Sequence, residues 1–306
     1  MSSSPQGKFE ASQFWASSAR SRNFKSSARL HLQHHLFQRT LGNRILQPTA
    51  EQAAVQCRAP LRVADLGCGN GVWLLDLEQS LTDLGVEVSL LEGFDVNPVN
   101  FPPKWSCPPN VAFTALDVLK PLPQELLGTY DIVHMRAFVS LITKNDPRPA
   151  IYQALSLLKP GGWLQWEETR VDRWTATAAQ SGEAEDAQSK ASCDAIIGIL
   201  DNGGRAQGNT FDFLATLGVH LERAGLVQVA SLELEKRRAD MKAWTEDYLL
   251  SWEEIANLIP PKAQAPDSPL TREMYEDLLD KAIAETEQGV AIHQQSVLVV
   301  MGRKPA

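Results

Sequence analysis

The stretch that decides the fold of this chain is Arg62-Val63-Ala64-Asp65-Leu66-Gly67-Cys68-Gly69-Asn70-Gly71. A short apolar strand ends in an acid, turns through glycines that lack a Cβ, and leads into a helical pattern from Val72. Amides that open such a helix carry partial positive charge and favour a polar or anionic ligand. A dinucleotide site has the spacing G-x-G-x-x-G, whereas the third glycine here comes one position early. The spacing therefore argues against a dinucleotide site.

Written as D-x-G-x-G-x-G, the same loop resembles motif I of the class I S-adenosylmethionine (SAM) methyltransferases. This resemblance implies SAM as the cofactor. It also implies that further contacts with SAM come from later strands of the same sheet.

Length and charge narrow the class of protein. With 306 residues, 43% of them hydrophobic, the chain can bury one large core or two modest ones. Residues 1–47 carry a local charge of +6, which leaves about −14 on the remainder against a total of −8. An acidic body argues against nucleic acid as a partner, because phosphate binding needs a basic surface. No apolar run approaches the roughly 20 residues of a membrane span, so we expect no membrane partner.

The cysteines and the N-terminus bear on location. The four cysteines lack the spacing of metal ligands, and Cys68 lies in the glycine loop, so we expect no metal site and a reducing, cytoplasmic environment. Residues 1–27 are polar, and we predict that they form a disordered tail ahead of a single domain over residues 28–306.

Strands and helices alternate on both sides of the glycine loop. The predicted strands cover residues 62–66, 86–94, 111–116, 131–135, 163–168, 226–235 and 296–302. Helices are predicted at 72–80 and, with Asp146 as N-cap, through residue 158. A further helical face runs from Phe211 to Ala224 and is closed by Gly225. The alternation predicts an α/β fold with a Rossmann-like, doubly wound, mostly parallel sheet of seven strands.

Three segments outside this alternation are predicted to form a helical lid over the strand ends. They are residues 28–50, 171–208 and 240–292. The first begins a helix at Ala28, the second contains an apolar helix at 193–200, and the third carries two apolar helical stripes. One stripe extends from Tyr248 to Ile259.

Polar side chains fall at the ends of four predicted strands. In an open α/β sheet the ligand lies beyond the carboxyl ends of the strands, which is where Asp65, Asp95, Asp117 and His134 are expected. Asp95 suits the two ribose hydroxyls of SAM, and Asp117 with the Val118 amide suits the adenine. Asp65 is expected under the loop, near the ammonium. The alternative is that these acids are strand-end caps.

Further strings narrow the resemblance to one group of methyltransferases. They are Arg29-Leu30-x-x-Gln33-His34, Gly93-Phe94-Asp95, Phe101-Pro102-Pro103, Tyr130 to Arg136, Leu157 to Glu168 and Gly302 to Pro305. Together they resemble the fungal secondary-metabolite methyltransferases related to the gliotoxin-pathway N-methyltransferase, and more distantly the LaeA regulators. This resemblance implies that Gly67, Gly69, Gly71, Asp95 and Asp117 contact SAM, and that the N-terminal helix, with Gln33 and His34, covers the cofactor or the acceptor. The full set of predicted cofactor contacts is Gln33, His34, Asp65, Gly67, Cys68, Gly69, Gly71, Asp95, Val96, Asp117, Val118 and His134.

Methyl transfer makes modest demands on the protein, which must hold the acceptor in line with the methyl group and exclude water. A neutral amine needs no base, whereas a hydroxyl gains from a base with a pKa near 7. His134 is the first candidate base, because imidazole titrates in that range. The alternative is that His134 orients SAM or caps the strand. Glu167 and Glu168 at the end of the next strand come second. Alternation sends only one of them toward the crevice, and Glu168 is the favoured one.

The sequence thus predicts a SAM-dependent methyltransferase that acts on O or N of a small-molecule fungal secondary metabolite. One alternative is a cyclase on the same fold that keeps SAM as a non-reacting cofactor. Another is a regulatory protein like the LaeA group, with its basic tail meeting nuclear partners.

Overall fold

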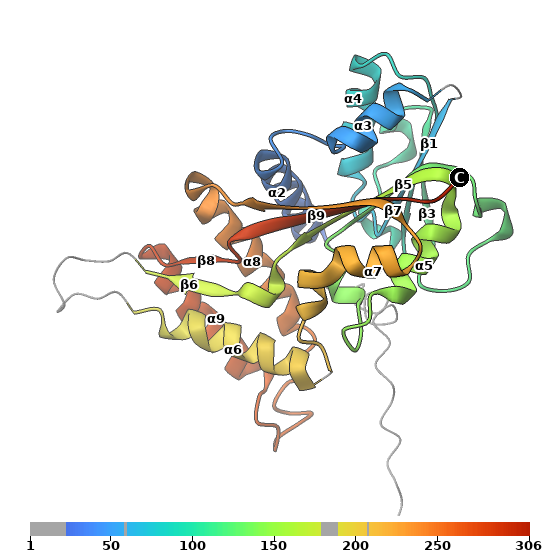
Figure 1. Cartoon of the computed structure of the whole chain (residues 1–306). Helices are drawn as coiled ribbons and strands as arrows, with labels where there is room; N and C mark the ends of the chain where they lie inside the picture. Colours follow the sequence, from blue (N-terminus) through green and yellow to red (C-terminus); the bar gives the residue numbers. More distant parts are fainter. Residues whose placement is uncertain (1–22, 58–59, 179–188, 207) are drawn as a thin grey trace, which may run out of the picture.

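A seven-stranded mixed sheet lies at the centre of the described part of the chain, which comprises residues 23–57, 60–178, 189–206 and 208–306 of a computed structural model (Figure 1). The strand order is β3-β2-β1-β4-β5-β9-β7. The parallel strands are β1 (Leu61–Leu66), β2 (Val88–Asp95), β3 (Val111–Ala115), β4 (Tyr130–Arg136) and β5 (Leu158–Thr169). Strand β9 (Ser296–Arg303) runs antiparallel to both of its neighbours, β5 and β7 (Val227–Glu235). This is the predicted doubly wound class, and the prediction is confirmed.

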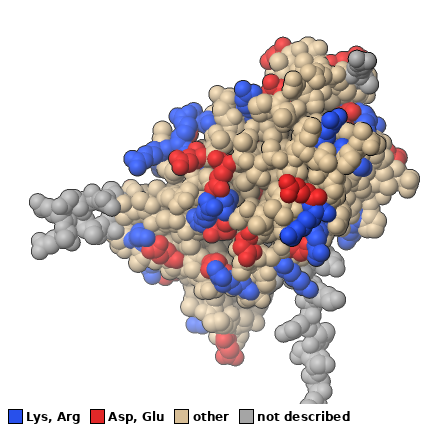
Figure 2. All heavy atoms as spheres, viewed as in Figure 1, with Lys and Arg blue, Asp and Glu red and all other residues tan. Residues whose placement is uncertain are grey.

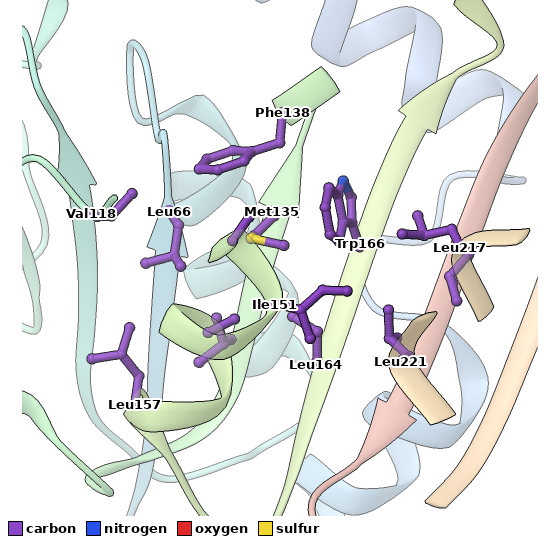
Figure 3. Packing of buried hydrophobic residues seen from close by; sticks show 14 of the residues in the cluster. Leu66, Val118, Met135, Phe138, Ile151, Leu157, Leu164, Trp166, Leu217 and Leu221 are labelled. Atoms are coloured by element: carbon purple, nitrogen blue, oxygen red, sulfur yellow. The ribbon is translucent and has the colours of Figure 1, made fainter. Parts of the chain in front are cut away.

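Helices cover both faces of the sheet (Figure 1). Helices α3 (Pro48–Val55) and α4 (Val72–Asp83) pack on one face, where Trp73 and Leu77 meet Val63 of β1. Helices α5 (Arg148–Leu157) and α7 (Leu217–Arg223), with the 3-10 turn η7 (Asp212–Thr216), pack on the other. Figure 3 shows this second face, where sheet residues meet helix residues in one apolar cluster: Leu66, Met135, Leu164, Trp166, Ile151, Leu157, Leu217 and Leu221.

The remaining helices gather beside the sheet and form a separate helical layer. It contains α2 (Phe24–Thr40), α6 (Ala191–Ala206), α8 (Met241–Ala256), α9 (Arg272–Glu287) and the small sheet of β6 (Thr175–Thr177) with β8 (Ala291–His293). Figure 1 shows α2, α8, α9 and α6 on one side of the molecule, away from α5. Their apolar faces share one core, which includes Phe37, Cys193, Trp244, Trp252 and Tyr275. Thus segments far apart in the sequence bury one another's apolar surface.

Short 3-10 turns complete the connections between these elements. They are η2 (Pro98–Asn100), η3 (Lys104–Ser106), η4 (Gln124–Leu126), η5 (Phe138–Leu141), η6 (Val171–Arg173) and η8 (Arg238–Asp240). Among the described residues, no helix combines the length and the apolar character needed to cross a membrane. Basic and acidic side chains are interspersed on the face shown in Figure 2, so that face carries no single large field of one sign.

The predicted boundary between tail and domain is wrong at its domain end. Helix α2 begins at Phe24, four residues before Ala28, because Asn23 is an effective N-cap. The Asn23 side chain accepts from the Lys25 amide at 2.7 Å, and the Ser26 hydroxyl accepts from the Asn23 amide at 3.0 Å. The rest of the predicted tail, residues 1–22, lies outside the described residues.

Other predicted boundaries also shift. Pro48 is the first residue of α3, a helix that was not predicted; its fixed φ suits proline to that position. Strand β5 begins at Leu158 rather than Trp163, because Leu158 pairs with Tyr130 across a register shift and so draws Lys159 to Gly162 into the strand. The N-cap of α5 is Pro147 rather than Asp146, which still accepts from the Arg148 amide.

Two predicted helical patterns are interrupted. The face from Phe211 to Ala224 begins one residue late, because Phe211 has a φ of 58° and cannot belong to a right-handed helix. It then divides into η7 and α7 at Thr216, whose φ of −122° is not helical. Helix α8 ends at Ala256, so Ile259 lies beyond it. The strands of the small β6–β8 sheet are three residues long, too short for a two-residue alternation to reveal them.

A glycine-to-alanine pair tests the packing under the glycine loop. A Cβ at Gly93 in β2 would lie 2.6 Å from Phe113 Cδ1 and 2.8 Å from Cys68 Sγ. We expect Gly93→Ala to lower the free energy of unfolding by about 1–3 kcal/mol through overpacking. The control is Gly198→Ala in α6, where a Cβ meets nothing within 4 Å and helix propensity favours alanine. Chemical denaturation that finds equal effects at both positions would contradict this packing.

Candidate active site

The glycine loop between β1 and α4 is built from glycines in the left-handed region. Gly67, Gly69 and Gly71 have φ values of 68°, 57° and 73°, which side-chain-bearing residues rarely adopt. Gly71 is also the N-cap of α4, and a Cβ there would lie 2.3 Å from Phe113 Cε1. The loop therefore presents bare backbone beside a helix N-terminus, a combination that favours polar or anionic groups. Cys68, between these glycines, is buried.

Asp95 meets this loop from the end of β2. Its Oδ2 accepts from the Gly69 amide at 3.0 Å and its Oδ1 accepts from the Asn97 amide at 2.9 Å. The residue is 6% exposed. Strand order explains the contact, because β1 and β2 are parallel neighbours whose carboxyl ends share one edge. The structure thus brings Asp95 and the glycine loop together, and Val96 follows half-buried.

Asp117 and Val118 lie at the same edge, one strand farther out. Strand β3 pairs with β2 through Ala115 and Asp95, and Asp117 follows two residues later. The Asp117 Oδ1 accepts from the Leu119 amide at 3.1 Å, while Lys120 Nζ lies 3.5 Å from Oδ2. Val118 is buried in the core on the α5 face.

Asp65 and His134 form a buried pair beneath the loop. They are opposite each other in β1 and β4, and Asp65 Oδ1 lies 2.7 Å from His134 Nδ1. His134 is fully buried and stacks on Trp73, with the ring centroids 3.6 Å apart. Burial opposes the charged imidazole, but the carboxylates of Asp65 and Glu167 outweigh it and raise the pKa of His134. His134 therefore faces the interior of the protein, against α4.

Helix α2 lies over the loop, but its two predicted site residues point in different directions. Leu30 Cδ1 lies 3.0 Å from the place of a Cβ on Gly69, and the Asn70 side chain donates to the Ser27 carbonyl at 3.1 Å. Gln33 donates to Asp247 Oδ2 of α8 at 3.3 Å. His34 instead faces the sheet and α4, with Nε2 2.9 Å from Asp76 Oδ2.

Glu167 and Glu168 are both fully buried, on opposite faces of β5. Burial opposes ionisation of Glu167, but the guanidinium of Arg136, which donates to it at 2.7 Å, and the neighbouring His134 lower its pKa to about 2. Glu168 lacks a cationic partner among the described residues. Its Oε1 accepts from the Phe138 amide at 2.6 Å and from Trp166 Nε1 at 2.7 Å, and burial raises its pKa to about 8.

Arg136 was not predicted as a site residue, although it joins several residues that were. Its Nε donates to Glu167, its Nη1 lies 2.8 Å from His34 Nδ1, and its guanidinium lies 4.7 Å from the Phe37 ring centroid. Alternation along β4 places it on the face of His134, which is the signal that would have found it.

The helical layer contains a second polar cluster, which no sequence pattern predicted. Lys236, which directly follows β7, is buried against the rings of Trp244 and Tyr248, with Nζ 4.0 Å from the Trp244 centroid. Its Nζ donates to the Tyr248 hydroxyl and lies 3.5 Å from Gln294 Oε1. Burial lowers the pKa of Lys236 to about 7. A lone lysine after a strand carries no sequence signal of this kind.

The part of the chain that contains this site matches a known protein family. Residues 32–227, which include the glycine loop, Asp95, Asp117 and Glu168, match the family described as a methyltransferase domain.

The chain belongs to this methyltransferase family. It is 32% identical to methyltransferase grgD of Penicillium sp, across 48% of this chain and 50% of grgD. It is 33% identical to N-methyltransferase gliN of Aspergillus fumigatus, across 48% of each chain. N-methyltransferase tcpN of Claviceps purpurea is 29% identical, across 94% of this chain and 97% of tcpN. The match therefore spans about half the length of grgD and gliN but nearly all of tcpN.

In this member of the methyltransferase family, the opposite environments of Glu167 and Glu168 predict opposite pH effects. Native Glu168 keeps its proton up to about pH 8, whereas an ordinary glutamate releases it near 4.5, so its contribution to stability falls as pH rises between these values. Glu168→Gln removes this contribution. We expect the stability of the variant, relative to wild type, to rise steadily from pH 5 to pH 8 in chemical denaturation.

Glu167→Gln is the matched control. Native Glu167 is ionised down to a pKa of about 2, so its contribution is present above pH 4.5 and is lost as pH falls toward 2. At pH 7 we expect the variant to lose about 3–5 kcal/mol, because Arg136 loses its buried partner. A stability difference between Glu168→Gln and wild type that does not change with pH would refute the assigned protonation state.

Proposed function

We propose that this protein transfers a methyl group from SAM to a nitrogen or oxygen atom of a small-molecule fungal secondary metabolite, with nitrogen favoured. The observation that carries the proposal is the hydrogen bond between Asp95 and the Gly69 amide. It joins the end of β2 to a glycine loop whose spacing is D-x-G-x-G-x-G. Membership of the methyltransferase family supports it, as does the similarity to gliN and tcpN, which are named as N-methyltransferases.

The residues at this edge of the sheet fit SAM. The loop leaves room because its glycines lack Cβ atoms, and Asp95 supplies a carboxylate for the ribose hydroxyls. Asp117 and the Val118 amide are suited to the adenine, and Asp65 and His134 support the loop from below. SAM supplies an electrophilic methyl group on a sulfonium that is already a good leaving group. The work left to the chain is to orient the acceptor and exclude water.

The acceptor side of the site is proposed to be the Lys236 cluster of the helical layer. Lys236 and Gln294 adjoin the end of β7 and the start of β9, at the same edge of the sheet as Asp95, because β7 runs parallel to β5. Several buried polar atoms there have no hydrogen-bond partner among the described residues: Trp244 Nε1, Asp247 Oδ1, His293 Nδ1 and Gln294 Nε2. Buried polar groups are normally paired, so these atoms suit the polar edge of a flat acceptor stacked on the neighbouring aromatic rings.

Burial of the candidate bases favours nitrogen over oxygen as the acceptor atom. His134 and Glu168, the two bases considered for a hydroxyl acceptor, are both fully buried and hydrogen-bonded within the chain. A neutral amine needs no base to attack the methyl group. We therefore assign His134 and Glu168 to support of the loop rather than to proton transfer.

Removal of the Asp95 carboxylate tests the cofactor site. Asp95→Ala leaves the ribose hydroxyls without a charged acceptor, so we expect SAM binding to weaken by about 2 kcal/mol, or roughly 30-fold in Kd. Titration calorimetry with SAM measures this. Asp83→Ala, at the exposed end of α4, is the control and should bind like wild type. Unchanged affinity in Asp95→Ala would refute the proposed ribose contact.

The reaction itself is tested by its stoichiometry. Incubation of the protein with SAM and fungal metabolite extracts should yield S-adenosylhomocysteine and, in equal amounts, a product heavier by CH2, because a methyl group replaces a hydrogen that leaves as a proton. Mass spectrometry measures both. An acceptor that is converted to an isomer, with no mass gain and without consuming SAM, would instead support the cyclase alternative. Omission of SAM is the control, and it should abolish the mass gain.

A further inference from the structure

We propose that His34, in its neutral form, is a positioning residue that holds α2 over the glycine loop by bridging Arg136 and Asp76. The proposal rests on the proposed function, because it concerns closure of the same SAM site. It adds a role for His34 in which the imidazole makes no contact with SAM and acts through the placement of α2.

Helix α2 lies close over the glycine loop and contacts it directly. Leu30 and Ser27 contact Gly69 and Asn70 from one turn of the helix, as described above, and Asn100 donates to the Ser26 hydroxyl at 3.4 Å. A cofactor seated on the loop would therefore lie under α2, and access to it depends on how firmly the helix is held. His34 lies one to two turns farther along the helix, on its buried side.

Hydrogen bonding fixes the protonation state of His34. Arg136 Nη1 can only donate, so His34 Nδ1, at 2.8 Å, must be the unprotonated acceptor. The proton then lies on Nε2, which donates to Asp76 Oδ2 at 2.9 Å. A second proton on Nδ1 would set two donors against each other. Only the neutral imidazole, in this one tautomer, satisfies both partners.

The charges around His34 agree with this assignment. The groups that face it are Asp76 of α4, Arg136 of β4 and Glu167 of β5; His31, one turn away on α2, is exposed and also acts on Asp76. Burial, together with the cationic Arg136, outweighs the two carboxylates and lowers the pKa of His34 below its ordinary 6.5. The closed position of α2 thus binds fewer protons than an open one. Closure is favoured above pH 6.5 and weakens as pH falls below it.

Glutamine separates the hydrogen bonds of His34 from its titration. Glu167 holds Arg136 from the other side, so the guanidinium stays in place in a His34 variant. In His34→Gln, the amide oxygen can accept from Arg136 and the amide nitrogen can donate to Asp76, but the side chain does not titrate. His34→Ala loses both bonds. The matched control is His35→Gln, an exposed histidine on the same helix.

The experiment is SAM titration calorimetry between pH 5 and pH 8 on the full chain. We expect wild type and His35→Gln to bind SAM more weakly as the pH falls. The Kd of His34→Gln for SAM should stay within about threefold of wild type at pH 8 and should rise less on acidification. His34→Ala should bind about tenfold more weakly at pH 8, the effect of losing hydrogen bonds worth about 1–1.5 kcal/mol. Wild-type pH dependence in His34→Gln, or wild-type affinity in His34→Ala, would overturn the proposal.

Hydrogen exchange of the α2 amides distinguishes failure of this inference from failure of the proposed function. Without SAM, the amides should exchange faster at pH 5.5 than at pH 7.5, after correction for intrinsic rates, in wild type but not in His34→Gln. If wild type does not bind SAM yet shows this difference, the proposed function fails and the role of His34 in holding α2 stands. Equal protection in both proteins at both pH values would refute that role.

Discussion

The ion pair between Arg136 and Glu167 connects the glycine loop, helix α2 and strand β5 at the carboxyl edge of the parallel strands. Glu167 is fully buried, and a carboxylate in that position is tolerated only when a cation and further donors compensate it. Arg136 provides the cation, and Gln165 donates to the second carboxylate oxygen at 2.7 Å. Gln165 in turn donates to the Ile45 carbonyl and accepts from the Gln47 amide, which ties the segment before α3 to the sheet. One buried charge therefore fixes both the sheet and the segment that follows α2.

From this pair, buried polar contacts continue in two directions. On one side Glu167 lies 3.7 Å from His134, which binds Asp65 directly before the glycine loop. On the other side Arg136 meets His34 of α2. The glycine loop and the helix that covers it are thus attached to the same pair of residues. Acidic and basic side chains alternate along most of this path, so a change in charge at one member alters the electrostatic environment of the next.

The sequence predicts the parts of this arrangement that follow from local rules. A strand that ends in an acid, glycine spacing and two-residue alternation locate β1, β2 and β4, and with them Asp65, Asp95 and His134. Contacts between elements far apart in the sequence depend on how those elements pack, and local rules do not predict them. The contact of Arg136 with His34 requires α2 to lie on the sheet, and the cluster around Lys236 requires α8, β7 and β9 to meet. No pattern within any one of these elements predicts which of the others it will contact.

The adjacent residues Glu167 and Glu168 show how burial, rather than residue type, decides charge. Alternation in β5 places them on opposite faces, a feature that the sequence does predict. Glu167 meets a guanidinium and stays ionised, whereas Glu168 meets neutral backbone amides and an indole and keeps its proton. Their partners nevertheless converge on one loop. Glu167 reaches it through His134 and Asp65, while Glu168 holds the Phe138 backbone, and the Phe138 ring lies 3.0 Å from the place of a Cβ on Gly67. The loop is therefore supported from both faces of the sheet, so its left-handed backbone is held by packing and charge as well as permitted by glycine.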